Sequence, residues 1–125
     1  MGQETPLDRI SLRGLRARGF HGVFEHERRE GQEFVVDVVL GVDSRAAART
    51  DDLSRTVHYG LLATALVEVI EGEPVNLIET LAQRLADTCL ARPGVHEVEV
   101  TLHKPQAPIP HQFDDVAVTI HRRRQ

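Results

Sequence analysis

Alternating apolar and polar positions predict four strands in this chain. The alternation is clearest over residues 33–43, where every second side chain is apolar, as in a strand that is buried on one face. Residues 8–18, 95–103 and 115–122 show the same period. In the first of these three segments, Gly14 shifts the phase of the alternation, which indicates a β-bulge.

Helical spacing of apolar residues predicts two helices between the second and the third strand. The first helix covers about 59–71 and the second about 77–91, each with an apolar stripe along one side. Asn76 is the expected N-cap of the second helix. Glu79 follows three residues later, which is close to the spacing of a capping box.

Three segments lack a regular period. Residues 19–32 are charged and bounded by glycines, and they predict a loop; residues 44–58 predict an irregular connector. The segment KPQAPIP at 104–110 holds three prolines and cannot form regular structure, because proline lacks a backbone N–H donor.

The predicted order ββααββ indicates an α+β fold, with one four-stranded antiparallel sheet and both helices on its apolar face. We expect a single domain at 8–122, an N-terminal tail at 1–7 and a basic C-terminal tail at 123–125. Open sheet edges favour aggregation unless they are paired. A ring of subunits joined edge to edge would pair these edges, so the pattern predicts oligomerisation.

Composition narrows the functional classes. The chain has 125 residues, 41% of them apolar, and 15 basic against 19 acidic residues give a formal charge of −4. Such a chain suits one compact domain and lacks the basic surface of a nucleic-acid binder. Its single cysteine, Cys89, excludes a disulfide scaffold and fits a reducing compartment. Without a secretory signal or an apolar run of ~20 residues, we expect a cytoplasmic protein that does not enter membranes.

Glu79 is the first candidate for binding chemistry. At a helix start, the helix dipole and free backbone N–H groups keep a carboxylate ionised. An ionised carboxylate can accept two parallel hydrogen bonds from a planar N–H/NH₂ edge, and a 2-amino-4-oxopyrimidine ring presents such an edge. The alternative is a glutamate that only caps its own helix.

Lys104 and Tyr59 are further candidates. A lysine that is held partly out of water can exchange protons near neutral pH, because burial disfavours its charged form; the alternative for Lys104 is a solvated side chain. Tyr59 is the only tyrosine and follows the irregular connector, where its ring can stack on a flat ligand. The alternative for Tyr59 is a place in the core.

One cluster on the charged loop resembles a metal site. It comprises His21, Glu25, His26 and Glu27, all of them residue types that can bind zinc. The signal is weak, because the sequence has no HExxH motif and the two histidines lie five residues apart on a loop. We therefore predict no metal site.

Four segments together resemble one known family. They are GFHGVFEHER at 19–28, DDLSRTVHYG at 51–60, VNLIETLAQRLA at 75–86 and HKPQAPIP at 103–110, and they resemble dihydroneopterin aldolase of the folate pathway over residues 8–122. The resemblance implies the T-fold (tunnelling fold), whose ββααββ order agrees with the pattern above. It also implies rings of four subunits, commonly stacked into octamers, with active sites between neighbouring subunits.

The reaction that this resemblance implies is a retro-aldol cleavage by a carbon–carbon lyase. It converts 7,8-dihydroneopterin into 6-hydroxymethyl-7,8-dihydropterin and glycolaldehyde. The C=N bond of the dihydropterin ring lies next to the side chain and takes up the electrons, so the substrate is its own electron sink. The resemblance thus implies no cofactor and no metal. Side-chain epimerisation is also expected, because the step is reversible until glycolaldehyde leaves.

The resemblance implies a role for each matching residue. Glu79, helped by the backbone of Ile78, would bind the 2-amino and N3–H edge of the pterin. Lys104 would be the general acid/base and would act through a water. Glu27 would bind the side-chain hydroxyls, with Glu25 as the second choice for that role.

Other matching residues complete the implied site. Val57 and Tyr59 would come from the neighbouring subunit, with Tyr59 stacking on the pterin and reaching the hydroxyl end of the substrate. Val23 would line the pocket, and His21 with Gly22 would be structural.

Three alternative functions share this fold. A dihydroneopterin triphosphate epimerase would need convergent cations for the triphosphate. A zinc-dependent pterin lyase would need three convergent histidines, whereas no His-x-His pair occurs here. A non-catalytic pterin-binding ring would need Glu79 but not the proton-transferring Lys104.

Overall fold

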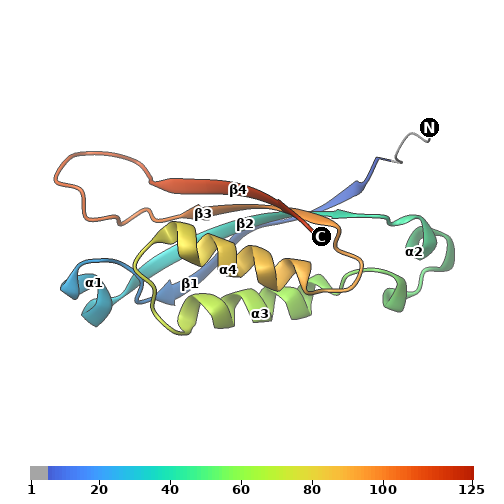
Figure 1. Cartoon of the computed structure of the whole chain (residues 1–125), viewed down its shortest axis with the longest axis horizontal. Coiled ribbons are helices and arrows are strands. Elements are labelled where there is room, and N and C mark those ends of the chain that lie inside the picture. The colour runs from blue at the N-terminus through green and yellow to red at the C-terminus, as the bar shows by residue number, and fades with distance from the viewer. Residues whose placement is uncertain (1–5) are drawn as a thin grey trace.

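The computed structural model describes residues 6–125, and its four strands form one antiparallel sheet in the order β1-β2-β3-β4 (Figure 1). The strands are β1 (Asp8–Gly19), β2 (Gln32–Val42), β3 (Glu97–His103) and β4 (Ala117–Arg123). The helical elements are α1 (Glu25–Glu30), α2 (Arg45–Thr50), the 3-10 helix η1 (Leu53–Arg55), α3 (Tyr59–Glu71) and α4 (Ile78–Leu90). The predicted α+β architecture is confirmed.

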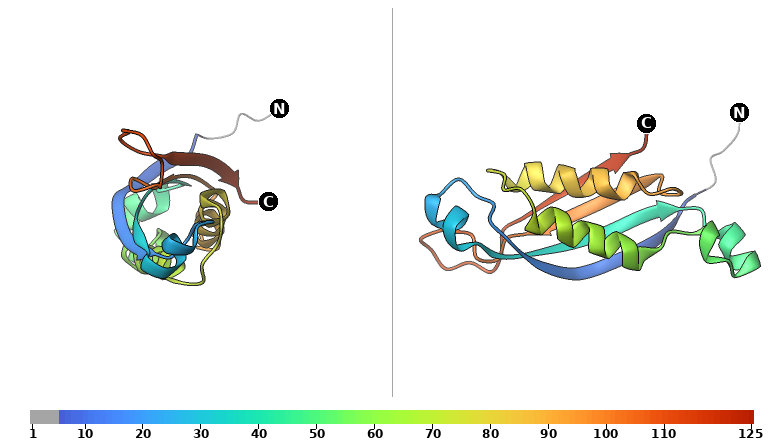
Figure 2. Two further views of the ribbon diagram at one scale, coloured as in Figure 1. Left: turned by 90° about the vertical axis from the view of Figure 1, so that its left-hand side faces the viewer. Right: turned by 90° about the horizontal axis from the view of Figure 1, so that it is seen from below.

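The core lies between one face of the sheet and the two long helices, α3 and α4. Alternate side chains of β2 and β3 point into it, and the sheet curves around both helices (Figure 2). The fully buried side chains that meet there include Phe34, Leu40, Val100 and Leu102 from the sheet and Leu62, Leu66, Leu81 and Leu85 from the helices. This is the arrangement that the apolar periods predicted.

The bulge expected in the first strand is present at Gly14. The pairing register of β1 and β2 shifts between Leu12 and Leu15, and Gly14 has φ 73°, a left-handed conformation that glycine adopts without a steric penalty. The freed N–H of Gly14 donates to Asp37 Oδ1 at 2.7 Å. The bulge therefore aims a backbone donor at a side chain of the neighbouring strand.

The predictions of a loop at 19–32 and of an irregular connector at 44–58 are wrong in part, because both segments contain short helices. The loop contains α1 and the connector contains α2 and η1. α1 and α2 have six residues each, too few to show a helical period in the sequence. Acidic residues in the first turn of α1 and arginines in its last turn complement the helix dipole instead.

The ends of two elements also differ from the prediction. The N-cap of α4 is Leu77, without a side-chain hydrogen bond, and Asn76 accepts a hydrogen bond from Arg28 instead. At the C-terminus, Arg123 belongs to β4, and the side chain of Arg124 donates to the carbonyls of Val95 and Arg92 at 2.9 and 2.7 Å. The basic tail expected at 123–125 is therefore largely part of the sheet and its edge.

None of the described helices is both long and apolar enough to cross a membrane.

Candidate active site

The centre of the candidate site is an ion pair between Glu27 and Lys104. Lys104 Nζ lies 2.7 Å from Glu27 Oε2, and the two side chains are only 12% and 2% exposed. Lys104 is the only lysine in the sequence. The alternative of a solvated lysine is therefore excluded by its burial.

Local structure around α1 explains why Glu27 is buried. Glu27 accepts hydrogen bonds from the Phe24 backbone N–H at 3.3 Å and from Gln32 Nε2 at 2.9 Å. Gly22 has φ 145°, and a Cβ at this position would collide with the Glu27 carboxylate. Glycine is thus required there by its conformation and by the closeness of the carboxylate.

The charge of Glu27 depends on its neighbours. Burial works against the charged form, but hydrogen bonds from Lys104, Gln32 and the Phe24 backbone outweigh it and hold the pKa of this carboxyl below its usual value. Glu25, the second choice, has a side chain that is 90% exposed and pairs only with Arg29 at 3.4 Å. The structure thus places Glu27, and not Glu25, against the lysine.

His21 fastens the loop before α1 to the rest of the molecule. The Val75 N–H donates to His21 Nδ1 at 3.1 Å, so the proton is on Nε2, which donates to the Ile70 carbonyl at 2.7 Å. Burial is the main reason why the pKa of His21 lies below its usual value. His21 is therefore a neutral, structural histidine, as the resemblance implied.

Lys104 is positioned by the end of β3. Its N–H donates to the Val116 carbonyl at 2.7 Å and its carbonyl accepts from the Ala107 N–H at 3.1 Å. Strand alternation places Leu102 and Lys104 on the helix-covered face of the sheet, where Leu102 is buried. The side chain of Lys104 therefore extends toward α1 and Glu27.

The start of α4 lies at the same end of the molecule. The preceding loop is fastened to the Glu27 segment, because the Gly22 N–H donates to the Val75 carbonyl at 2.9 Å. Ile78 is half-buried, and Glu79 is exposed with no hydrogen-bond partner among residues 6–125. Glu79 therefore does not form a capping box, and its carboxylate is free to receive a ligand. Val23 is also exposed at this end.

Tyr59 and Val57 lie at the opposite end of the molecule. Tyr59 begins α3, whereas Ile70, near the other end of that helix, accepts the hydrogen bond from His21. A helix rises 1.5 Å per residue, so about 17 Å of helix axis separates Tyr59 from the Glu27 end. Figure 1 shows α2 and the start of α3 far from α1.

A pocket of about 490 Å³ opens beside Tyr59, between α2, η1 and the start of α3. The tyrosine is 62% exposed, which excludes the alternative of a core residue. Val57 lines the same pocket, but it is 4% exposed and belongs to the core. His58 caps α3 by accepting from the Leu61 N–H at 3.2 Å.

The structure therefore brings five predicted residues to one end of the molecule: Val23, Glu27, Ile78, Glu79 and Lys104. It leaves Tyr59 and Val57 at the other end. Sequence reasoning missed Gln32, the buried partner of Glu27. Its place at the first position of a strand gave no signal of that contact.

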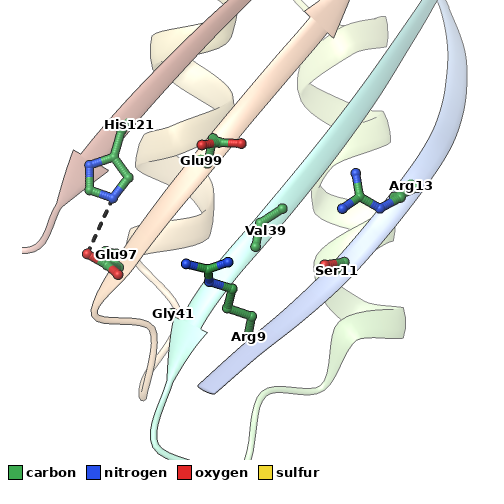
Figure 3. A pocket seen from close by; sticks show the side chains of 8 residues that line it. All are labelled: Arg9, Ser11, Arg13, Val39, Gly41, Glu97, Glu99 and His121. Atoms are coloured by element: carbon green, nitrogen blue, oxygen red, sulfur yellow. Dashed lines mark ion pairs between the residues drawn. The ribbon is translucent and has the colours of Figure 1, made fainter. Parts of the chain in front are cut away.

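The open face of the sheet carries a second hollow, of about 260 Å³. Figure 3 shows Arg9 and Arg13 of β1 on one side of it and Glu97 and Glu99 of β3 on the other. None of the predicted site residues lines this hollow. Within residues 6–125, no group of three or more His, Cys, Asp or Glu side chains is placed to hold a metal ion.

Comparison with known proteins identifies the family. The sequence model of the family described as dihydroneopterin aldolase matches residues 10–121. The chain belongs to the dihydroneopterin aldolase family. The resemblance seen in the four sequence segments is thereby confirmed, and with it the carbon–carbon lyase class of the family.

Individual relatives agree over almost their whole length. The dihydroneopterin aldolase of Streptomyces coelicolor is 63% identical over 118 residues, which cover 94% of this chain and 99% of that protein. The dihydroneopterin aldolase of Bacillus subtilis is 40% identical, with 94% and 99% covered. The structure is similar to that of E. coli dihydroneopterin aldolase in complex with neopterin, with TM-score 0.84, 30% identity, and 93% and 99% of the two chains covered. The T-fold expectation is thus confirmed.

Proposed function

We propose that this member of the dihydroneopterin aldolase family cleaves 7,8-dihydroneopterin, with Lys104 as the residue that moves the proton. The observation that carries the proposal is the ion pair of the only lysine with buried Glu27. A non-catalytic pterin binder would not need a lysine in this position. The neopterin bound by the E. coli relative supports a pterin substrate.

The proposed reaction needs one base, one acid and no added electron acceptor. Lys104 reacts in its neutral form, after Nζ has released a proton to solvent, and takes the proton of the hydroxyl on the second side-chain carbon directly or through a water. The bond between the first and second side-chain carbons breaks, glycolaldehyde leaves, and the electron pair enters the ring C=N bond. The lysine ammonium then returns the proton to the first side-chain carbon, which gives 6-hydroxymethyl-7,8-dihydropterin. No proton is gained or lost overall.

Glu27 supports this proton transfer by holding the lysine. Its Oε2 atom accepts from both Lys104 and Gln32, so it fixes the position of Nζ and stabilises the ammonium form. Oε1 accepts only a long hydrogen bond from the Phe24 N–H among the described residues. This second oxygen is the one that we propose binds a side-chain hydroxyl of the substrate.

The pterin ring is proposed to lie at the start of α4. The free carboxylate of Glu79 would accept from the 2-amino and N3–H groups in two parallel hydrogen bonds. The backbone of Ile78 would add a further contact, and exposed Val23 would cover part of the ring. The N-terminal end of a 13-residue helix favours the negative charge of Glu79.

The site is proposed to be completed by a neighbouring subunit in a ring-shaped homo-oligomer. β1 and β4 are the two edges of the described sheet, and edge-to-edge joining would pair both. The neighbour would contribute Tyr59, stacked on the pterin, and Val57. We further propose that the enzyme works in the cytoplasm, a reducing compartment that suits its free, buried Cys89.

Product analysis tests the proposed reaction. Purified protein in excess EDTA is given 7,8-dihydroneopterin, and glycolaldehyde and 6-hydroxymethyl-7,8-dihydropterin are quantified together. We expect equal amounts of both products. Absence of cleavage would overturn the proposal, and repeating the assay with the triphosphate and then with zinc would identify an epimerase or a zinc lyase.

The same assay measures side-chain epimerisation, which we propose as a secondary activity. Re-addition of glycolaldehyde to the other face of its carbonyl, before it leaves the site, inverts the second side-chain carbon. Recovered substrate should therefore contain a growing fraction of the epimer. Recovery of the original isomer alone would show that glycolaldehyde departs faster than it adds back.

A further inference from the structure

His103, the residue before Lys104, is held between two carboxylates on the open face of the sheet. His103 Nδ1 lies 2.6 Å from Asp115 Oδ2, and Nε2 lies 2.9 Å from Asp37 Oδ2. A neutral imidazole has one N–H and can donate to only one of them, whereas an imidazolium donates to both. The two short contacts together therefore require the protonated ring.

These contacts join four parts of the fold. Asp37 belongs to β2 and also accepts from the Gly14 N–H at the bulge of β1. His103 ends β3, and Asp115 lies two residues before β4, at the far end of the proline-rich loop. Next to it, the Lys104 N–H donates to the Val116 carbonyl at 2.7 Å. A side-chain contact and a backbone hydrogen bond thus close the base of this loop side by side.

As a result, contacts on both faces of the sheet hold Lys104 in position. Its side chain extends to Glu27 on the helix-covered face, while the adjoining His103 faces the other way. From this geometry we propose that His103, doubly ion-paired with Asp37 and Asp115, is a positioning residue that holds the Lys104 backbone in place for proton transfer. The proposal rests on the function proposed above for Lys104.

The position of Lys104 should then depend on the charge of His103. Hydrogen bonds with Asp115 and Asp37 raise the pKa of His103 above its usual value. Three charged groups of other segments act on the His103 ring: Asp37 of β2, Asp115 of the loop and, through Asp37, Arg13 of β1. On β4, the residue that pairs with His103 is the uncharged Ala117. Since protonation of His103 maintains both contacts, they are formed while the ring is charged and are lost as the pH rises through its raised pKa.

The single lysine allows a direct test. In isotope-labelled protein, the Lys104 Nζ nucleus gives the only lysine side-chain amine signal, so its NMR shift can be followed against pH together with the His103 ring signals. We expect an inflection in the Lys104 signal at the pH where His103 titrates, and its absence in His103→Gln. This readout does not require activity, so the positioning role can be judged even if the proposed reaction fails.

Kinetics provides the second readout. His103→Gln should lower kcat about 10-fold and leave KM within about twofold, because a small misplacement of a catalytic group slows the chemical step. His103→Arg should restore kcat and prevent the fall of kcat at alkaline pH, since arginine remains charged and donates to both carboxylates. The matched control is His121→Gln, because His121 also lies on the open face and pairs with Glu97 at 3.3 Å, away from Lys104.

If His103→Gln does not fold, Asp115→Asn removes one of the two contacts and should have the same effects in smaller measure. An unchanged Lys104 signal and unchanged kcat in a folded variant would overturn the proposal. So would an equal fall of kcat in His121→Gln.

Discussion

The two ends of this molecule differ in how complete they are. The Glu27 end is fastened by many internal contacts: a buried ion pair, a neutral buried histidine, and backbone hydrogen bonds that join the loops before α1 and α4. The Tyr59 end is an open pocket with an exposed aromatic ring. One end thus holds charged groups in fixed positions, and the other offers an open surface with an exposed aromatic ring. In the proposed function, each end is half of a site.

Chemistry explains this division. A proton-transferring lysine and its carboxylate must be held rigidly, because their relative position decides the rate. A ring that covers a flat ligand needs mainly contact area.

Removing the lysine should have the largest effect. Lys104→Ala is expected to lower kcat by about 10²- to 10⁴-fold, the contribution of general acid–base catalysis, while the Kd for the pterin product changes little. If binding and turnover fall together, Lys104 binds the substrate and does not act as its acid/base.

A second variant separates this effect from stability. Lys104→Ala leaves the buried Glu27 carboxylate without its cation, which is destabilising in itself. Adding Glu27→Gln should recover thermal stability without recovering turnover. Glu25→Gln is the matched control and should alter neither, because Glu25 is exposed and surface ion pairs contribute little.

Removing the charge of Glu79 should have the next largest effect. Glu79→Gln is expected to raise the Kd for the pterin by about 10- to 100-fold, from the loss of charge-assisted hydrogen bonds. Since Glu79 caps no backbone group, the melting temperature should fall only slightly, by the loss of the interaction between its charge and the helix dipole. Glu73→Gln, the same substitution in the preceding exposed loop, should leave the Kd unchanged. Unfolding of Glu79→Gln would instead assign Glu79 a structural role.

Acid should weaken the Glu27 end modestly, through His21. The pKa of His21 lies below its usual value of 6.5 in the folded protein, so the unfolded chain binds this proton more readily. His21 thus contributes its full stability above pH 6.5, and the contribution declines as the pH falls below that value. In NMR, the His21 ring should titrate at a lower pH than a histidine of the unfolded chain, and the free energy of unfolding should fall as the pH drops below 6.5. A His21 ring that titrates at or above its usual pKa would contradict this.

The fold could be predicted well from the sequence, because strand alternation and helical spacing both result from burial on one face. The sheet and the helices α3 and α4 show these two periods. Short elements escaped prediction for a physical reason. α1 is held by capping contacts, dipole-complementing charges and the contacts of Glu27, none of which produces a period. The predicted N-cap of α4 was wrong, because the side chain of Asn76 accepts a hydrogen bond from Arg28 instead.

The candidate residues could be chosen from the sequence only where motif and chemistry coincided, as at Glu79 and Lys104. The partners that position them were not visible. Gln32, Asp37 and Asp115 are ordinary polar residues whose importance depends on which segments the fold brings together. The separation of Tyr59 from Lys104 also required the length and direction of α3.

Subunit mixing tests most directly whether the two ends form one site. Lys104→Ala and Tyr59→Ala are each prepared alone, then unfolded together in equal amounts and refolded. If each site takes Lys104 from one copy and Tyr59 from its neighbour, about one quarter of the interfaces in a mixed ring carry both native residues, and about that fraction of native activity should return. Activity no greater than the average of the two separate variants would show that the two ends do not share a site.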